Sequence, residues 1–272
     1  MSHAARRALA LGLLLLLGFC LPALLAPWLA PHDPAALDLA GALEPPGPGH
    51  WLGRDEQGAD ILSRLLYGAR ISLLVGLATV ALSATLGTAV GVAAGYAGGA
   101  VEQALMRLVD VLLAFPGLLL AIALVAVLGP GMVNVVIALT ALGWTGFARL
   151  ARAQVLGVMP LDYVQAARSL GAGPVRIMAV HILPNILGPI WVQASFGVAG
   201  AILAEAGLSF LGLGAPPGTP SWGAMLSDGK SVLMEAPHVS LAPGLAIMAV
   251  VLGFNLLGDA LGDWLDPRRS RE

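Results

Sequence analysis

Charged residues and cysteines are scarce in this chain of 272 residues. Only 11% of the residues are charged, against about 25% in an average soluble domain, and 58% are hydrophobic. This composition excludes an ordinary soluble domain and indicates an integral membrane protein. Cys20 is the single cysteine and lies in an apolar run, which excludes disulfides and cysteine-based metal sites. The net charge is −2 and no basic run exceeds two residues, so we expect no nucleic-acid partner.

A nucleotide-binding motif is also lacking. Gly229-Lys230-Ser231 resembles the end of a phosphate-binding loop, but that loop needs a glycine five residues earlier, where this chain has Ala224. Any ATP hydrolysis linked to this protein must therefore come from a partner. We predict that the chain is not an enzyme and holds no cofactor.

The histidines show no spacing typical of metal ligands. His32, His50 and His238 are each separated from other histidines, from Cys20 and from suitably spaced acids, so we expect them to be solvated loop residues. His181 lies in a polar segment and is expected to pack or cap there. The sequence therefore predicts no metal site.

Six apolar runs are long enough to cross a bilayer, which takes about 20 residues of helix. They cover residues 8–30, 71–97, 108–128, 132–148, 184–204 and 241–257. Lipid offers no partner for a free backbone amide, so each run is predicted to be a helix. The predicted fold class is an all-α polytopic membrane protein with six transmembrane helices. Arg6 and Arg7 before the first run also fit a signal peptide, but the length of that run favours an uncleaved anchor.

The basic residues predict the orientation of the spans. With the N-terminus inside, ten basic residues lie on the cytoplasmic side and four lie outside. The inner ones are Arg6, Arg7, Arg107, Arg149, Arg152, Arg168, Arg176, Arg268, Arg269 and Arg271, and the outer ones are Arg54, Arg64, Arg70 and Lys230. We therefore predict an anchor at 1–30, an extracytoplasmic segment at 31–70, a transmembrane core at 71–260 with a cytoplasmic loop at 149–183, and a cytoplasmic tail at 261–272.

Two helical patterns bear on packing. Ile61, Leu62, Leu65 and Leu66 share one helix face, which fits either a helix on the membrane surface or an extension of the second span. In the second span, glycines recur at four-residue spacing and are predicted to let another helix approach closely. These are Gly87, Gly91 and Gly95.

Few acidic residues fall within or beside the spans. Asp110 follows Arg107 by three residues, which favours a local ion pair over a role in transport. Asn255 and Asp259 lie four apart and are expected to bond between helices. Glu205 and the nearby Ser209 follow the fifth span near the predicted outer surface. Two interpretations stay open for them, a gate or pathway lining and an interhelical hydrogen bond.

The stretch 162–171, Asp-Tyr-Val-Gln-Ala-Ala-Arg-Ser-Leu-Gly, is a polar, helix-forming island in this apolar chain. Asp162 is predicted to cap the helix and Gly171 to end it, while Val164, Ala167 and Leu170 recur at helical spacing. The orientation argument places this short helix in the cytoplasm. It is suited to docking into a groove of another protein.

This stretch resembles the EAA loop of ABC-importer permeases, which contacts the cytoplasmic ATPase. The matching positions are Ala166, Ala167, Gly171, Leu183 and Pro184, and the ATPase-coupling residues implied by the resemblance are Asp162, Gln165, Ala166, Ala167, Arg168 and Gly171. From residue 51 to residue 268 the chain is similar to the second permease subunit of dipeptide, oligopeptide and nickel importers. The similar blocks are 66–73, 106–110, 115–116, 205–214, 221–223, 254–261 and 266–268. Gln165, Ala59 and Gly262 replace charged residues usual in that family.

The resemblance implies a bacterial inner-membrane permease with a five-helix type I core and alternating access. Expected partners are a second homologous permease, two ATPase subunits, a solute-binding protein and membrane lipid. Peptides are the leading substrate, with nickel, glutathione or a sugar conjugate as alternatives. An ion channel or proton-coupled transporter would cluster charges at mid-span, and an intramembrane enzyme would place a His-acid or Ser-base set within the spans. Neither pattern is found in the sequence.

Overall fold

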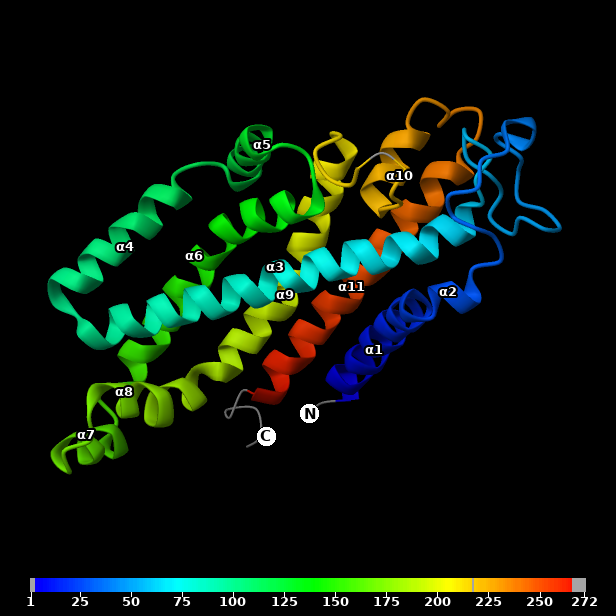
Figure 1. Cartoon of the computed structure of the whole chain (residues 1–272). Coiled ribbons are helices and arrows are strands. Elements are labelled where there is room, and N and C mark those ends of the chain that lie inside the picture. Colours follow the sequence, from blue (N-terminus) through cyan, green and yellow to red (C-terminus); the bar gives the residue numbers. More distant parts are fainter. Residues whose placement is uncertain (1–2, 217, 266–272) are drawn as a thin grey trace.

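Helices form nearly all of the regular structure in this chain. The computed structural model describes residues 3–216 and 218–265, in which the only extended pairing consists of two isolated bridges. Figure 1 shows the arrangement. In chain order the elements are α1 (His3–Leu24), α2 (Ala26–Leu29), η1 (Leu39–Gly41), α3 (Ile61–Ala97), α4 (Gly99–Leu113), α5 (Gly117–Leu128), α6 (Met132–Val158), α7 (Asp162–Ser169), α8 (Pro174–Arg176), η2 (Ile177–Ile182), α9 (Leu183–Phe210), α10 (Trp222–Gly229) and α11 (His238–Leu265).

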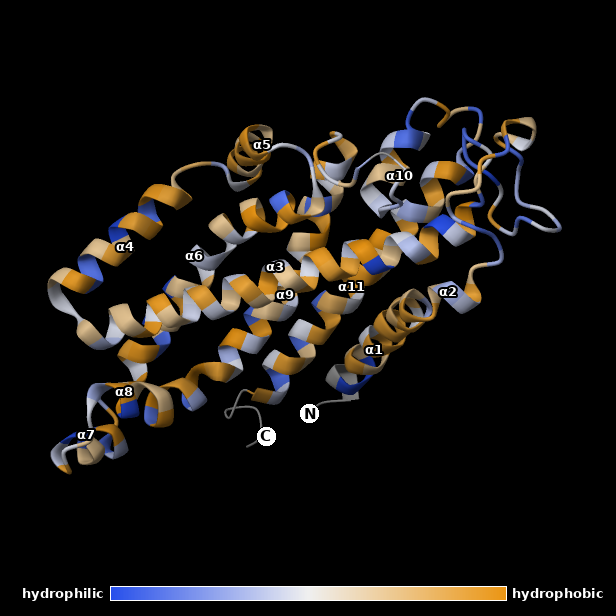
Figure 2. Ribbon diagram, viewed as in Figure 1, coloured by the Kyte–Doolittle hydropathy of each residue, from blue (hydrophilic) through white to orange (hydrophobic). Residues whose placement is uncertain are grey.

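Five helical segments in the described residues are long and apolar enough to span a membrane. They are Arg6–Leu24, Ile61–Ala97, Met132–Val158, Pro174–Phe210 and His238–Leu265, and α4 with α5 makes a sixth span if the bent pair is counted as one. Figure 2 shows hydrophobic residues along all of these helices. The all-α, multi-pass prediction is confirmed. Four of the six predicted spans fall within these segments, and the first, 8–30, begins in Arg6–Leu24 but was placed six residues too long.

The predicted third span, 108–128, is not one straight helix. It is divided between α4 and α5, which meet at an angle of 86°. Pro116 lies at the break, directly before α5, and disfavours helical backbone at the residue before it. The prediction of a single straight span was wrong. It was based on the length and hydropathy of the apolar run, and neither takes account of the helix-breaking effect of Pro116.

The helix α3 runs unbroken through 37 residues. At 1.5 Å per residue it is about 55 Å long, well beyond a hydrocarbon core of about 30 Å. The interpretation of residues 60–67 as a separate surface helix is therefore wrong, and they are the first turns of α3. Asp60 caps this helix by accepting a 2.8 Å hydrogen bond from the Ser63 amide.

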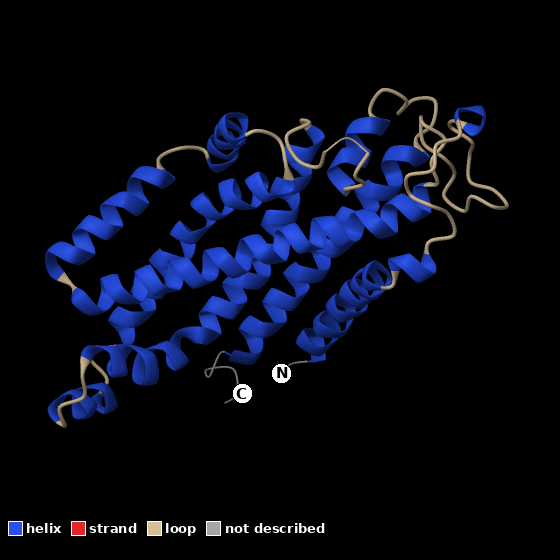
Figure 3. Ribbon diagram, viewed as in Figure 1, coloured by secondary structure: helices blue, strands red, loops and turns tan. Residues whose placement is uncertain are grey.

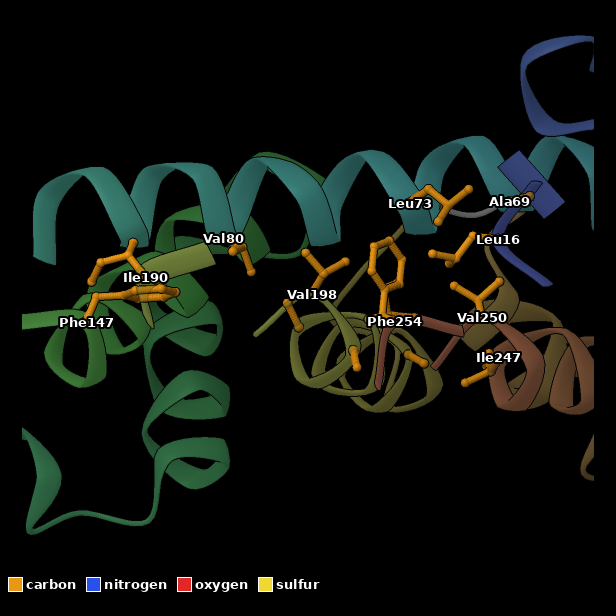
Figure 4. Close-up of a cluster of buried hydrophobic side chains, with 14 of the residues drawn as sticks. Leu16, Ala69, Leu73, Val80, Phe147, Ile190, Val198, Ile247, Val250 and Phe254 are labelled. Carbon is orange, nitrogen blue, oxygen red and sulfur yellow. The ribbon is translucent and has the colours of Figure 1, made fainter. Parts of the chain in front are cut away.

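The core is built around α3, which packs on α6 and α9, while α11 packs on both α9 and α1. Figure 4 shows buried side chains from these helices meeting along α3, among them Leu73, Val198 and Phe254. All are non-polar and fill the space between helices by contact alone. The helices of this core extend to both ends of the molecule.

The glycine stripe of α3 faces α6. A Cβ atom on Gly87 would lie 2.2 Å from the carbonyl oxygen of Trp144, and one on Gly91 would lie 2.3 Å from that of Ala148. At Gly95 the nearest atom would be the Cβ of Val155, at 2.9 Å. The two helix backbones thus approach so closely that a methyl group has no room.

The two ends of the bundle differ in character. Figure 3 shows the longest loops gathered at one end, where residues 30–60 and the segments around α10 lie. At the opposite end lie α7, α8, the start of α1 and the end of α11 (Figure 1). Any functional surface outside the membrane belongs to one of these two ends.

Candidate functional site

The helix α7 is attached to the body by few contacts. Val164 is its one fully buried residue, while Tyr163 is 41% exposed and the flanking Leu161 and Leu170 are 45% and 88% exposed. Exposed leucines and a tyrosine beside a short helix form an apolar surface at this end of the molecule. Such a surface is typical of a protein contact.

The predicted end of α7 at Gly171 agrees with the structure, but the predicted start does not. Asp162 was expected as the N-cap, but this expectation is wrong. The helix begins one residue earlier, because the carbonyl of Leu161 already accepts from the amides of Val164 and Gln165. Asp162 instead places its charge in the first turn, where the helix dipole favours an anion. At the other end, Gly171 follows the C-cap with φ +80°, a backbone conformation that favours glycine.

Two polar side chains of α7 fix its position. The Gln165 side-chain amide donates to the Met159 carbonyl at 2.7 Å, which closes the turn between α6 and α7. The guanidinium of Arg168 lies 5.7 Å from the ring centre of Tyr96, near the end of α3. Ala166 is exposed and Ala167 is half-buried. The small side chains of the motif therefore border the outward surface while the larger polar ones hold the helix in place.

A continuous helical segment links α7 to the membrane core. Residues Pro174–Phe210 pass from α8 through the π-helical η2 into α9. Pro184 has no amide hydrogen to donate, and a widened turn next to it accommodates that loss. The side chain of Asn185 donates to the carbonyl of His181 at 2.8 Å, so the junction keeps a hydrogen bond.

A cavity of about 330 Å³ lies between α3, α9, α6 and the α4–α5 pair. Its polar lining includes Thr79, Ser83, Thr145 and Gln193. The hydroxyls of Thr79 and Ser83 are buried and have no hydrogen-bond partner within the part of the chain that the structure describes. Nothing in the sequence singled out these residues, because hydroxyls are common in apolar helices and only their convergence is informative.

Glu205 and Ser209 do not line this cavity. Glu205 is fully buried, and its two oxygens accept hydrogen bonds from Ser72 on α3 at 2.9 Å and from Ser209 at 2.7 Å. The amide of Trp222 in turn donates to the Ser72 hydroxyl at 3.4 Å. Of the two interpretations left open, the structure has the interhelical hydrogen bond. This network joins α3, α9 and α10 at one point.

The predicted local pairing of Asp110 is wrong. Asp110 forms an ion pair with Arg149 of α6, and Glu102 pairs in the same way with Arg152. Because α4 lies beside α6, a partner on the neighbouring helix replaces the nearby Arg107. The four charged residues line a surface cavity of about 630 Å³ together with Arg107.

At the opposite end, the structure gathers residues that the sequence keeps apart. The Nδ1 atom of His50 lies 2.8 Å from Oδ1 of Asp60, and that of His32 lies 3.7 Å from the same oxygen. The His50 side chain is 17% exposed and the Nε2 atom of His238 is buried, so the prediction of solvated histidines is wrong for these two, whereas His32 is exposed. His50 and His32 lie ten and twenty-eight positions before Asp60 in the chain. The local sequence pattern does not predict how the segment between them folds.

The electrostatics at this end involve two further acids. Arg64 pairs with the buried Asp55 and, at 3.3 Å, with Asp228. Burial raises the pKa of the Asp228 carboxyl, and the charge of Arg64 only partly offsets this effect. Burial also acts to raise the pKa of Asp60, but hydrogen bonds from Ser63 and His50 outweigh it, so this pKa lies below its ordinary value.

Comparisons with known proteins agree with this architecture. The family model described as binding-protein-dependent transport system inner membrane component matches residues 87–271. The di/tripeptide transport system permease protein DppC of Pseudomonas aeruginosa is 45% identical over 264 residues, covering 94% of this chain and 86% of the relative. The glutathione transport system permease protein GsiD of Pectobacterium atrosepticum is 47% identical over 262 residues, covering 96% and 87%.

A solved structure supports the same fold. A chain of the MetNI methionine ABC transporter, in an inward-facing conformation, superimposes with a TM-score of 0.58 at 17% identity. The match covers 73% of this chain and 94% of the other. The fold is therefore that of a type I ABC importer's membrane subunit. The family model and the relatives' names make the chain a multi-pass permease subunit and not an enzyme. The chain belongs to the family of inner-membrane components of binding-protein-dependent transport systems. Membership implies an ATPase and a solute-binding protein as partners.

Proposed function

We propose that this chain forms one half of the transmembrane pathway of a peptide importer. The observation that carries the proposal is the identity of about 45% over nearly the whole chain with permeases named for di- and tripeptides and for glutathione. All of these are small, polar molecules with amide groups. The unpaired hydroxyls of Thr79 and Ser83 and the amide of Gln193 supply donors and acceptors suited to such a solute.

The pathway lies, in this proposal, between the cavity and a second homologous permease chain. The cavity is lined by α3, α9, α6 and the α4–α5 pair of this chain, and the second chain would cover its opening. An apolar groove of about 550 Å³ between α3, η2 and α9, lined by residues such as Trp191 and Met178, offers a further surface for that chain. Two permeases together would enclose the solute.

The helix α7 docks into an ATPase subunit on the cytoplasmic side. Support comes from its exposed leucines, its weak attachment and the ten-to-four distribution of basic residues. The start of α1 and the end of α11 lie at this end of the bundle, so in this proposal they face the cytoplasm too (Figure 1). ATP-driven movement of the ATPases reaches α9 through α8 and η2, which act as a rigid link.

Uptake of a radiolabelled dipeptide tests the substrate class. The chain is expressed with its co-encoded subunits in cells that lack dipeptide import, with glutathione and Ni²⁺ as unlabelled competitors. Dipeptide uptake that needs all subunits, and that falls at least tenfold on Gln193→Trp, is the expected result. The variant fills the cavity, whereas Leu203→Trp, an equally bulky change at an exposed position of the same helix outside both the cavity and the groove, serves as a control. No dipeptide uptake by cells that hold all the subunits would refute a peptide substrate.

A further inference from the structure

The end of the molecule opposite α7 carries an organised cluster of two histidines and one aspartate. The side-chain nitrogens of His32 and His50 and the carboxylate of Asp60 place their ligand atoms within 4.8 Å of one another. The two imidazole rings stack with centroids 4.4 Å apart and planes inclined by 28°. Both rings direct Nδ1 at the same carboxylate oxygen, Oδ1 of Asp60.

Ser63 holds this arrangement together. Its hydroxyl donates to Oδ2 of Asp60 at 2.7 Å and accepts from the backbone amide of His32 at 3.1 Å. The Ser63 amide also donates to Oδ2, at 2.8 Å. One carboxylate oxygen is therefore used to cap α3, and the other is left for the histidines. Orientation of ligands by hydrogen bonds from a second layer of residues is typical of metal centres.

We propose that His32, His50 and Asp60 form a binding site for a divalent transition metal ion such as Zn²⁺. Two imidazole nitrogens suit Zn²⁺, Ni²⁺ and Cu²⁺ better than Mg²⁺ or Ca²⁺, and a carboxylate oxygen commonly joins histidines in zinc sites. The metal would take the place of the proton that His50 Nδ1 shares with Asp60. It would leave the proton of each ring on Nε2, and water would complete the coordination.

The nitrogen-to-oxygen distances fit this replacement, and the stacked rings must turn so that both ring planes contain the ion. Ligand atoms about 2.0–2.1 Å from a tetrahedral zinc lie about 3.3 Å from each other. The two nitrogen-to-oxygen distances observed, 2.8 and 3.7 Å, lie on either side of that value. The His32 side chain is 40% exposed, so the ion has a path from solvent and room for a water ligand.

Nearby charges do not oppose a cation. Arg64, the closest arginine along α3, is engaged by Asp55 and Asp228 and so is not a counter-ion of Asp60. The carboxylate of Asp60 is 1% exposed and supplies the negative charge directly at the site. At the start of α3, the Ser63 amide and hydroxyl both donate to Oδ2 of Asp60, which leaves Oδ1 for the ion.

A metal here would tie three segments together. His32 follows α2, His50 lies in the long loop, and Asp60 starts α3. A bound ion would therefore fix the loop of residues 30–60 on the end of α3, and binding only to the folded state would raise its stability. This site goes beyond the transport function and does not depend on the identity of the solute.

The test is Zn²⁺ titration of the full-length chain, free of any histidine tag, purified with its companion subunits into lipid nanodiscs after removal of metals. Calorimetry should show one Zn²⁺ bound per copy of this chain. The variants are His32→Gln, which changes an exposed side chain, and Asp60→Asn, which keeps a residue able to cap α3. Each should weaken Zn²⁺ binding at least tenfold, since even supporting residues around a metal typically contribute 10–100-fold.

The matched control is His181→Gln, which removes a histidine at the opposite end and should leave the titration unchanged. Co²⁺ added in place of Zn²⁺ should produce visible absorption bands in the wild type and not in His32→Gln. Excess Mg²⁺ or Ca²⁺ should not compete. Absence of Zn²⁺ binding in the wild type, or equal affinity in wild type, His32→Gln and Asp60→Asn, would overturn the proposal and leave a hydrogen-bonded His–Asp cluster only.

Discussion

Replacement of Gly91 by alanine tests whether the close contact between α3 and α6 holds the core together. The added methyl group would lie 2.3 Å from the carbonyl oxygen of Ala148 and 2.7 Å from the Cβ of Ala151. The nearest of these is a backbone atom, so no side-chain rotation relieves the overlap. The two helices would have to separate by about 1 Å to restore ordinary contact.

The magnitude follows from two opposing effects. Insertion of a methyl group into a well-packed core costs typically about 1–3 kcal/mol. Glycine to alanine within a helix also gains up to about 1 kcal/mol of helix propensity. A control with the same gain and no overlap is Gly157→Ala on α6, where a Cβ would meet no atom within 4 Å. Relative to this control, Gly91→Ala should therefore be less stable by about 1–3 kcal/mol.

Thermal denaturation of the purified proteins in detergent, followed by size-exclusion chromatography of heated samples, measures the difference. At roughly 2–4 °C per kcal/mol for a chain near this size, Gly91→Ala should melt several degrees below Gly157→Ala. Gly95→Ala should fall between them, because its nearest neighbour is the Val155 side chain and not a carbonyl. Equal melting temperatures for all three variants would show that the stripe does not set the distance between α3 and α6.

Three further outcomes are expected at other positions. Gly171→Val forces a β-branched residue into a backbone with φ +80°, at a cost of about 1–2 kcal/mol. This variant should reduce co-purification of the ATPase without loss of inserted protein. Undiminished co-purification would count against α7 as the docking helix. Glu205→Ala leaves the proton of the buried Ser72 hydroxyl without an acceptor and should lower the melting temperature. Glu205→Gln, which can still accept this proton, should lower it less, and the reverse order would contradict the network. Asp228 keeps its proton to higher pH in the folded protein than in the unfolded chain, because its pKa is raised from 3.8. The free energy of unfolding of the wild type, relative to Asp228→Asn, should therefore fall as the pH rises from 3.8 through the raised pKa. Unfolding free energies that change with pH in parallel for the two proteins would contradict this sign.

The amino-acid sequence by itself determined the class of this protein and much of its architecture. Long apolar runs require backbone hydrogen bonds within each segment, so helices crossing a membrane follow from composition alone. The stop at Gly171 and the spacing of Gly87, Gly91 and Gly95 are likewise local, since each depends on residues within a few turns of one helix. The break at Pro116 is local as well, and the proline was a sufficient signal that hydropathy did not include.

The tertiary structure alone decided the partners of the polar groups. Asp110 pairs with Arg149, thirty-nine residues away, and Glu205 bonds with Ser72 across 133 positions. His32 reaches Asp60 only because the loop between them folds back onto the start of α3. Such pairings depend on which helices lie side by side and on how they are rotated, and many arrangements bury the same apolar faces equally well. A single sequence therefore specifies which groups need partners, while the packing of the helices determines which partners they find.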